Sequence, residues 1–274
     1  MDQNNDDVAL CVATMEVEAW TDFYTAVPAE AKKELGIDHF RTGHQDEALC
    51  IVCRELDGHI FNRLFGLRTP GRAADTAVDA ASSTFRDLDL RQWAVQLSPS
   101  SAELIQLVRD RGLSEHPRVW AKFIRDGTED LQPHSSQIAV WEIASEEGGQ
   151  FGSVAAKVYG MPPAAGEWIG ALAGRPGWSL YGAFDDGELV ATGATFRKEK
   201  FAWLGFAATL ATHRGKGAQS GLLRQRLASA FEGGARLITT ETGIPLEGES
   251  AASYRNIGRS GFRIVDSRLH FKMR

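Results

Sequence analysis

A long apolar run that leads into a glycine-rich loop is the feature that most constrains the fold of this chain. The run FAWLGFAATL covers residues 201–210. Alternate residues of a strand point to opposite faces, and both alternating sets are apolar here, which predicts a central strand covered on both faces. Gly205 in its middle predicts a bulge. The loop ATHRGKG (211–217) follows, and beyond it apolar residues recur with a 3.6-residue period. That period predicts a helix with one buried face, formed by Leu222, Leu223, Leu227, Ala230 and Phe231.

The loop has the composition of an anion-binding site. The first backbone N–H groups of a helix have no partners within the helix, and they lie at the positive end of its dipole. Gly215 and Gly217 allow close approach of the backbone and positive φ angles. Arg214 and Lys216 add positive charge at the rim. The loop therefore predicts a phosphate site.

Spacing excludes two common phosphate motifs. A Walker loop requires Ser or Thr after its Gly-Lys pair, whereas Lys216 is followed by Gly217. A dinucleotide fingerprint requires a third glycine, and Gln219 and Ser220 do not supply it. A glycine-rich turn before a surface helix, without a ligand, remains the alternative.

Residues 137–274 predict a mostly antiparallel sheet with helices, an α+β (mixed α/β) fold. Asp185-Asp186-Gly187 predicts a tight hairpin between two strands. The polar segment 126–136 contains a proline and no apolar periodicity, so it is the predicted linker. Strands are expected at 136–144, 178–184, 188–196, 236–242 and 262–273, and helices at 146–160, 164–174 and 249–260.

The first half repeats this order of elements. It shows strand-like runs at 59–67, 92–97 and 118–125 and helical patterns at 74–88 and 101–112. The loop RTPGRA (68–73) stands where the glycine-rich loop stands in the second half, but Pro70 removes one backbone N–H from it. We therefore predict two copies of one fold, with domains at 1–125 and 137–274 and the linker between them. Chance agreement of common elements is the alternative.

Composition excludes several functional classes. The chain has 36 acidic and 30 basic residues and a formal charge of −6, which argues against a general binder of nucleic acid or of anionic membranes. No apolar run approaches the roughly 20 residues of a spanning helix, and the start MDQNNDDVAL is acidic and polar. A cytoplasmic protein is expected. The acidic surplus favours a cationic partner.

A lone CxxC motif, Cys50 and Cys53, lies inside the apolar stretch ALCIVCREL. This stretch predicts a buried strand, in which residues three apart point to opposite faces and do not converge on one metal. We expect a structural role and no metal, with zinc binding or redox chemistry as the alternative.

In order and length of elements, residues 137–274 resemble the GCN5-related N-acetyltransferase (GNAT) family. The resemblance rests on the bulged strand, on HRGKGAQSGLL with the helix behind it, and on a short helix that ends in Ser260-Gly261-Phe262 before the last strand. It implies acetyl-CoA as co-substrate and two GNAT-like domains, the first one diverged. It places the pyrophosphate at Arg214, Gly215, Lys216, Gly217, Ala218, Gln219 and Ser220, and the pantetheine arm along Ala207, Ala208 and Thr209. Thr209 also lies near the position where the family polarises the thioester carbonyl.

Three positions depart from the family pattern. Gln219 replaces a small residue, but its backbone N–H can still donate if its side chain points away from the cofactor. Ala211 stands where a proline is common. Ile257 occupies the position of the usual general acid, a tyrosine, so protonation of the leaving thiolate is in doubt.

Glu241 and Tyr254 are the candidates for acid and base chemistry. Glu241, at the end of the strand RLITTET, is the candidate base, with a solvated carboxylate as the alternative. Tyr254, one helical turn before Ile257, is the candidate substitute acid, with a packed tyrosine as the alternative. Asn256 is expected either to contact the pantetheine, to cap a backbone group or to lie on the surface, and His213 is expected at the loop rim.

The sequence therefore predicts an N-acetyltransferase that uses a small-molecule or peptide amine and acts as a monomer or homodimer. A non-catalytic acyl-CoA-binding or regulatory protein is the second hypothesis. The first copy is expected to be degenerate, with its own binding of CoA as the alternative.

Overall fold

The computed structural model describes residues 3–56, 58–127 and 138–273, and the chain divides into two compact units. The N-terminal unit consists of residues Met1–Thr25, Lys32–Lys122 and Val265–Arg274. The C-terminal unit consists of Ala26–Ala31 and Phe123–Ile264.

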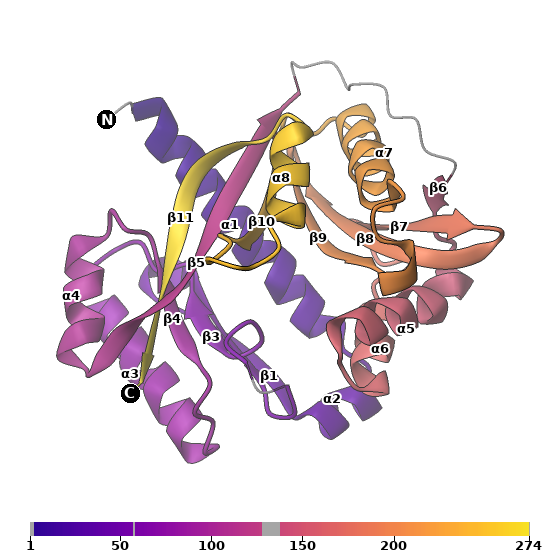
Figure 1. Ribbon diagram of the computed structural model, residues 1–274. Helices are drawn as coiled ribbons and strands as arrows, with labels where there is room; N and C mark the ends of the chain where they lie inside the picture. Colours follow the sequence, from indigo (N-terminus) through magenta and orange to yellow (C-terminus); the bar gives the residue numbers. More distant parts are fainter. Residues whose placement is uncertain (1–2, 57, 128–137, 274) are drawn as a thin grey trace. The chain divides into compact units, whose positions relative to one another are not determined.

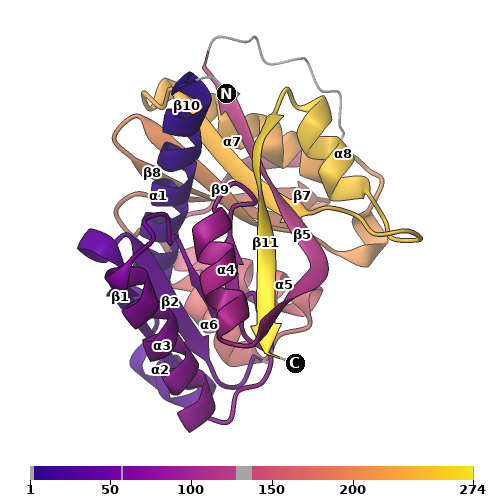
Figure 2. The same ribbon diagram turned by 90° about the vertical axis from the view of Figure 1, so that its left-hand side faces the viewer.

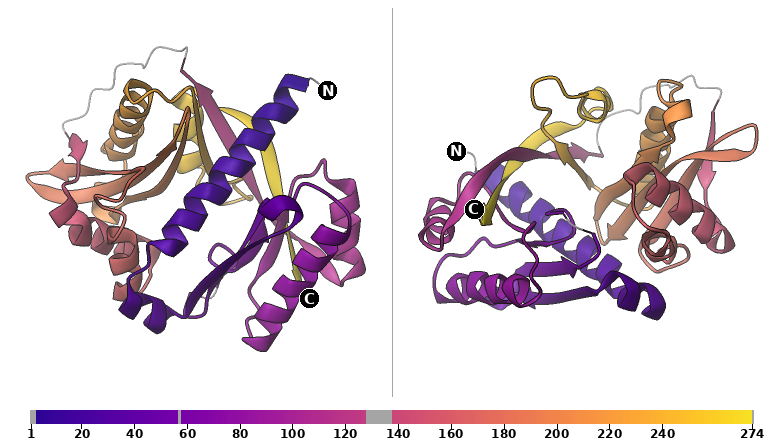
Figure 3. Two further views of the ribbon diagram at one scale, coloured as in Figure 1. Left: turned by 180° about the vertical axis from the view of Figure 1, so that it is seen from behind. Right: turned by 60° about the horizontal axis from the view of Figure 1, so that its bottom comes forward.

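In the N-terminal unit, helices cover both faces of a sheet. Strands follow the order β1-β2-β3-β4-β11-β5, and Figure 3 shows α1 and α3 on opposite sides of β1, β2 and β3. Apolar side chains of α3 and α4, among them Val78, Phe85 and Leu104, form one core with β2, β3 and β4. The elements are α1 (Gln3–Thr25), α2 (Ala29–Leu35), β1 (Ile37–Thr42), η1 (His44–Asp46), β2 (Ala48–Cys53), β3 (Arg63–Phe65), α3 (Arg72–Asp87), β4 (Ala94–Leu97), α4 (Ala102–Asp110) and β5 (Leu113–Asp126).

The CxxC motif lies in β2, and all six residues of this strand are buried. Cys50 belongs to the core under α3 and α4, whereas the Cys53 thiol donates to the Leu35 carbonyl oxygen at 3.6 Å. Burial raises the pKa of both thiols, that of Cys53 to about 11. The predicted buried strand is confirmed. Nowhere in 3–56, 58–127 and 138–273 do three or more His, Cys, Asp or Glu side chains gather as a metal site would require.

The C-terminal unit has the strand order β5-β10-β9-β8-β7-β6. Figure 1 shows α7 on one side of β7, β8 and β9 and α5 and α6 on the other. The elements that follow residue 137 in the chain are β6 (Ala139–Glu142), η2 (Ser145–Glu147), α5 (Gly148–Tyr159), α6 (Pro163–Gly170), β7 (Trp178–Asp185), β8 (Glu188–Lys198), β9 (Phe201–Thr209), η3 (Ala211–His213), α7 (Ala218–Glu232), β10 (Leu237–Gly243), α8 (Ala252–Arg259) and β11 (Arg263–Met273), of which β11 lies mostly in the N-terminal unit.

The order of elements is the same in both units, as predicted. Each unit has an antiparallel hairpin, β1–β2 or β7–β8, and the second strand of the hairpin pairs antiparallel with a third strand, β3 or β9. A helix then leads to a fourth strand, β4 or β10, which is parallel to the third. The β7–β8 hairpin turns at Asp186 and Gly187, which both have positive φ, as expected for a type I′ turn. The fold is a mixed α/β fold with mostly antiparallel strand pairs.

The last strand of each sequence copy is divided between the two units. Residues 265–273 of β11 group with the N-terminal unit, where β11 pairs with β4, and Figure 2 shows β11 alongside β5. Residues 123–126 of β5 group with the C-terminal unit. The compact units therefore differ from the expected boundaries of 1–125 and 137–274. Most of the predicted linker, residues 128–136, lies outside the described residues.

The helices that the structure describes include none that is long and apolar enough to span a membrane.

Candidate functional site

Strand β9 separates from β10 halfway along its length. The parallel pairing of the two strands runs from Phe201 to Leu204, which lies opposite Thr240. Within residues 205–209, Gly205, Ala208 and Thr209 continue to pair with β8 on the other side. One edge of this segment of β9 is thus available for an extended ligand that adds to the sheet.

A bulge follows Gly205 in β9. Gly205 lies opposite Ala194, and Ala208 lies opposite Thr192, so Phe206 and Ala207 face a single residue of β8. Phe206 has φ +51°. The predicted bulge is confirmed, with its extra residue directly after the glycine.

Glycines lie directly before the bulge in β9 and opposite it in β8, where bulky side chains occupy the space that a Cβ atom would need. A Cβ at Gly205 would lie 1.9 Å from the Trp203 ring, and one at Gly193 would lie 2.8 Å from Cζ of Arg226. Any larger residue at either position would displace Trp203 or Arg226.

The loop before α7 has the backbone shape that its glycines predict. Gly217 is the N-cap of α7 with φ 89° and ψ −1°, and Gly215 has φ 80°. The N-terminus of α7, with its unpaired N–H groups and positive dipole end, lies directly behind them. This geometry suits a phosphate group.

A pocket of about 570 Å³ joins the open segment of β9 to this loop and to α8. It is lined by all but one of the predicted cofactor-binding residues, namely Ala207, Ala208, Thr209, Arg214, Gly215, Gly217, Ala218, Gln219, Ser220 and Asn256. The structure therefore brings together residues from three elements that the sequence placed at one site. Their role in binding stays a prediction.

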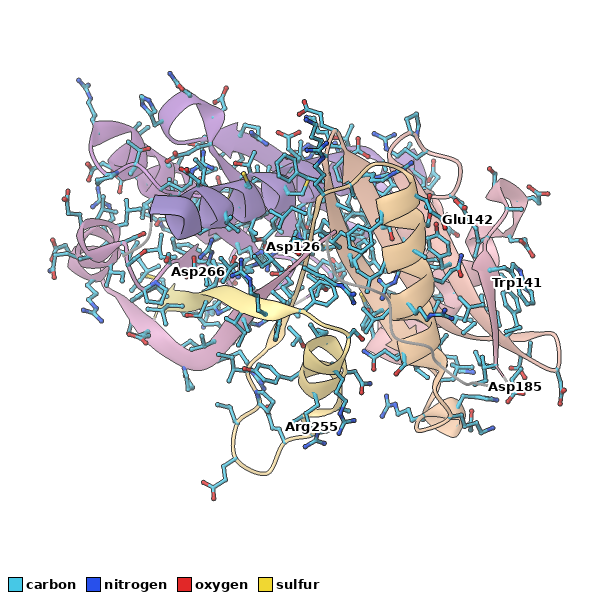
Figure 4. All side chains as sticks on the ribbon, turned by 90° about the horizontal axis from the view of Figure 1, so that it is seen from above. Asp126, Trp141, Glu142, Asp185, Arg255 and Asp266 are labelled. Carbon is cyan, nitrogen blue, oxygen red and sulfur yellow. The ribbon has the colours of Figure 1, made fainter. Side chains whose placement is uncertain are left out.

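Lys216 is the remaining member of the predicted set, and its ammonium group is turned to Asp185. The Lys216 Nζ and the His213 Nε2 lie 3.4 Å and 3.3 Å from the same Asp185 carboxylate oxygen. Figure 4 shows Asp185 beside the loop that precedes α7. We infer that Lys216 and His213 fix the loop to the β7–β8 hairpin. His213 also lines the pocket.

The side chain of Gln219 crosses from α7 to α8. Its Oε1 accepts a hydrogen bond from Nδ2 of Asn256 at 2.9 Å, and its Nε2 lies 3.5 Å from Oγ of Ser253. The long side chain thus links the two helices on either side of the pocket, while its backbone N–H remains part of the α7 N-terminus.

The charged side chains that line the pocket are all cationic. Arg255 and Arg259 of α8 join Arg214 there, and no aspartate or glutamate of the described residues lines it. In a chain of net charge −6, this local surplus indicates an anionic ligand. The sequence analysis missed Arg255 and Arg259. Their spacing of four residues on a short helix was the available signal.

Glu241 and Tyr254 are not among the described residues that line this pocket. Glu241 is the first residue of β10 beyond the parallel pairing with β9, at the point where the strands diverge. The Tyr254 ring packs edge to face on Phe123, with centroids 5.3 Å apart. Ile257 is buried with 5% of its surface exposed.

Comparisons with known proteins agree with this geometry. Residues 140–258 match the model of the acetyltransferase (GNAT) family. A search of curated proteins found no match.

Among solved structures, the fold is similar to a GCN5-related N-acetyltransferase from Kribbella flavida, at 17% identity and TM-score 0.62, over 89% of this chain and 94% of the other. A GCN5-related N-acetyltransferase from Sphaerobacter thermophilus is 18% identical with a TM-score of 0.60, over 82% of this chain and 80% of the other. A tandem GNAT protein from the clavulanic acid biosynthesis pathway is 15% identical with a TM-score of 0.61, over 98% of this chain and 95% of the other. The chain thus has the tandem GNAT fold, and its residues 140–258 match the GNAT family model; in general, the GNAT fold supports acyl-CoA-dependent acetyl transfer.

Proposed function

We propose that the C-terminal unit transfers an acetyl group from acetyl-CoA to an amine of a small molecule or peptide. The observation that carries this proposal is the pocket itself, in which the open segment of β9 leads to a helix N-terminus surrounded by arginines. A site of this kind suits a ligand that is extended at one end and polyanionic at the other.

The residues fit acetyl-CoA in two parts. The loop amides from Gly215 to Ser220 and the side chain of Arg214 would bind the pyrophosphate. The open edge of Ala207, Ala208 and Thr209 would pair with the amides of the pantetheine arm. Asn256, fixed by Gln219, lies where it can contact that arm.

The chemistry requires a neutral amine in line with the thioester carbon. Its nitrogen forms the new C–N bond, the C–S bond breaks, and sulfur keeps the electron pair. The attacking nitrogen then loses a proton, and the thiolate takes one up. We assign the first proton transfer to Glu241, directly or through water, and the second to Tyr254.

The second candidate is an acyl-CoA-binding protein without turnover. One observation favours it: Ile257, at the position of the family's usual tyrosine, is buried and has no acidic proton. Tyr254 on the same helix is the substitute on which the catalytic proposal depends.

The test is binding of acetyl-CoA by calorimetry, followed by release of CoA over a panel of small amines and peptides with free N-termini. We expect binding and turnover on a subset of the panel. Gly215→Asp should weaken binding, because it brings a carboxylate to the phosphates and strains the loop backbone at φ 80°, although a Cβ there meets no other atom within 4 Å. Binding without turnover on any acceptor would favour the second candidate. Unchanged binding by Gly215→Asp would contradict the loop assignment.

A variant of the proposed base separates chemistry from binding. Glu241→Gln should lower kcat by about 100-fold and leave the Kd of acetyl-CoA unchanged. An equal kcat in the variant would show that Glu241 is a solvated carboxylate without a role in proton transfer.

A further inference from the structure

A buried arginine lies behind the bulge of β9. Arg226 of α7 exposes 1% of its surface. Its Nη1 donates to the carbonyl oxygens of Ala194 at 3.3 Å and Gly205 at 3.2 Å, and its Nε donates to that of Leu222 at 3.2 Å. These carbonyl groups belong to β8, to the bulged part of β9 and to the helix itself. The guanidinium therefore joins the two strands at the bulge.

No carboxylate of the described residues pairs with Arg226. Burying a cation without an anionic partner is costly, and hydrogen bonds to carbonyl dipoles offset only part of that cost. Burial lowers the pKa of Arg226 to about 10, so it remains protonated at neutral pH. Leucine or methionine at this position of the apolar helix face would avoid the cost. A cation kept here requires an explanation beyond packing.

The carbonyl groups of the bulge are held by three side chains from three elements. Gly205 accepts from Arg226 of α7, Phe206 accepts from Oγ1 of Thr192 in β8 at 3.2 Å, and Ala207 accepts from the Tyr159 hydroxyl of α5 at 2.9 Å. A peptide group is planar and trans, so each held carbonyl also fixes the direction of the following N–H group. The N–H directions of residues 206, 207 and 208 are thereby set before any ligand binds.

We propose that Arg226 is a positioning residue for acetyl transfer: it fixes and polarises the peptide groups of the bulge so that their N–H groups stabilise negative charge on the thioester oxygen. The inference rests on the proposed function. A cation at the carbonyl end of a peptide group strengthens that group as a donor at its N–H end. Donors fixed in advance where charge develops lower the barrier, because they need no reorganisation during the reaction.

The test uses acetyl-CoA labelled with carbon-13 at the thioester carbonyl. Isotope-edited infrared spectroscopy of the bound ligand reports polarisation of the carbonyl as a lower stretching frequency than in free acetyl-CoA. We expect this lowering in the wild-type protein, its loss in Arg226→Met and its partial recovery in Arg226→Lys. For the amine of the panel that releases CoA fastest, Arg226→Met should lower kcat by about 10- to 100-fold. The Kd of acetyl-CoA should change by less than about threefold.

Tyr181→Phe is the matched control. It removes another contact between α7 and the sheet, the partly buried 2.6 Å hydrogen bond from the Tyr181 hydroxyl to Ser229. A general loosening of this packing would change both variants alike. We expect the carbonyl frequency and kcat of Tyr181→Phe to equal those of the wild-type protein.

Tyr159→Phe keeps the proposal testable if Arg226→Met does not fold. The Tyr159 side chain is 45% exposed, so loss of its hydroxyl should leave the fold intact while it releases the Ala207 carbonyl. We expect a smaller change of frequency and kcat in the same direction. Wild-type values in a folded Arg226→Met would overturn the role of Arg226 and leave the proposed function standing. If Arg226→Met is unfolded, wild-type values in Tyr159→Phe would overturn the fixing of the bulge carbonyl groups, on which the role of Arg226 rests. No binding of acetyl-CoA by the wild-type protein would overturn the proposed function and this inference together.

Discussion

The two copies of the fold carry the same local signature, an arginine followed three residues later by a glycine that caps a helix. Arg68 and Gly71 precede α3, and Arg214 and Gly217 precede α7. Both glycines have positive φ, 116° and 89°. From this signature alone, both loops suit an anion.

The N-terminal loop already holds an anion that belongs to the chain. One carboxylate oxygen of Glu47 accepts from the backbone N–H groups of Arg68 and Thr69 at 3.0 and 2.9 Å. The other accepts from the Thr69 hydroxyl at 3.0 Å. Glu47 is 8% exposed, so this carboxylate is an internal part of the loop. The corresponding loop of the C-terminal copy lines an open pocket instead.

The strands before the two loops also differ. In the N-terminal copy, β3 ends at Phe65 and α3 begins at Arg72. In the C-terminal copy, β9 continues to Thr209 beyond its pairing with β10, and α7 begins only at Ala218. In the described residues of the first copy, β3 extends beyond its pairing with β4 by Phe65 alone, which leaves too little strand edge for an extended arm. An arginine and a helix-capping glycine therefore do not make a ligand site by themselves. The loop also needs backbone N–H groups that no side chain of the protein occupies, and a strand edge that leads to the loop.

Substitution of the two helix-capping glycines should show the difference between the two copies most clearly. Gly217→Asp should weaken acetyl-CoA binding on the order of 100-fold, because it distorts the loop and adds a negative charge among the phosphates' hydrogen bonds. Gly71→Asp, the matched change, should lower stability by about 1–3 kcal/mol through backbone strain and leave binding unchanged. Calorimetry and denaturation measure the two effects. Equal losses of binding would contradict the difference between the copies.

Acid should destabilise the N-terminal unit through His270. Burial lowers the pKa of this histidine to about 3. The unfolded state, with a pKa of about 6.5, therefore binds the proton first as the pH falls, and the free energy of unfolding decreases below pH 6.5. We expect a loss of about 2 kcal/mol between pH 7 and pH 5. Urea denaturation at both values measures it.

His270→Asn should reduce this pH dependence and leave the part that His59 causes, because burial also lowers the pKa of His59, to about 4. His44→Gln, a change of an exposed histidine, should retain all of it. A pH dependence that is unchanged in His270→Asn would show that other groups cause the loss.

Glu47→Gln tests whether the internal carboxylate stabilises the first loop. The neutral amide weakens charge-assisted hydrogen bonds, so we expect a loss of about 1 kcal/mol in the free energy of unfolding. One acetyl-CoA should bind per chain both before and after the change, because the strand edge is still missing. A second equivalent bound by the variant would mean that Glu47 alone closes the N-terminal site.

Gln219→Ala should have the smallest effect. It gives the C-terminal loop the alanine that the N-terminal loop has at the matching position, Ala73. The variant loses the link to Asn256 but keeps the backbone N–H, so we expect acetyl-CoA binding to weaken by about threefold at most. A loss as large as that of Gly217→Asp would show that the side chain itself contacts the ligand.

Local patterns sufficed for much of the fold. The hairpin at Asp186 and Gly187, the bulge after Gly205 and the buried strand around Cys50 each follow from backbone preference or from apolar periodicity, which act over a few residues. Nine of the ten predicted residues that line the pocket lie within 207–220, because the strand, the loop and the start of α7 are contiguous in the chain, and the tenth, Asn256, lies in α8.

The sequence patterns gave no prediction for α1. Its buried residues, among them Val12, Met15, Val17 and Trp20, do not follow one narrow stripe, so the periodic signal is weak. No sequence pattern indicated that Arg226 is buried. An arginine is expected at the surface, and only the structure shows the carbonyl groups that accept its hydrogen bonds.

Short-range sequence patterns were enough to predict the order of elements, the duplication and the loop that can bind an anion, because glycine conformation and apolar spacing are properties of neighbouring residues. Only the tertiary structure decided which loop is open, since Glu47 is far from Arg68 in sequence, and which strand completes each sheet. Tertiary structure also placed Arg226 behind the bulge and Arg255 beside the pocket. Such contacts join residues distant in the chain, and they depend on how the helices and strands pack.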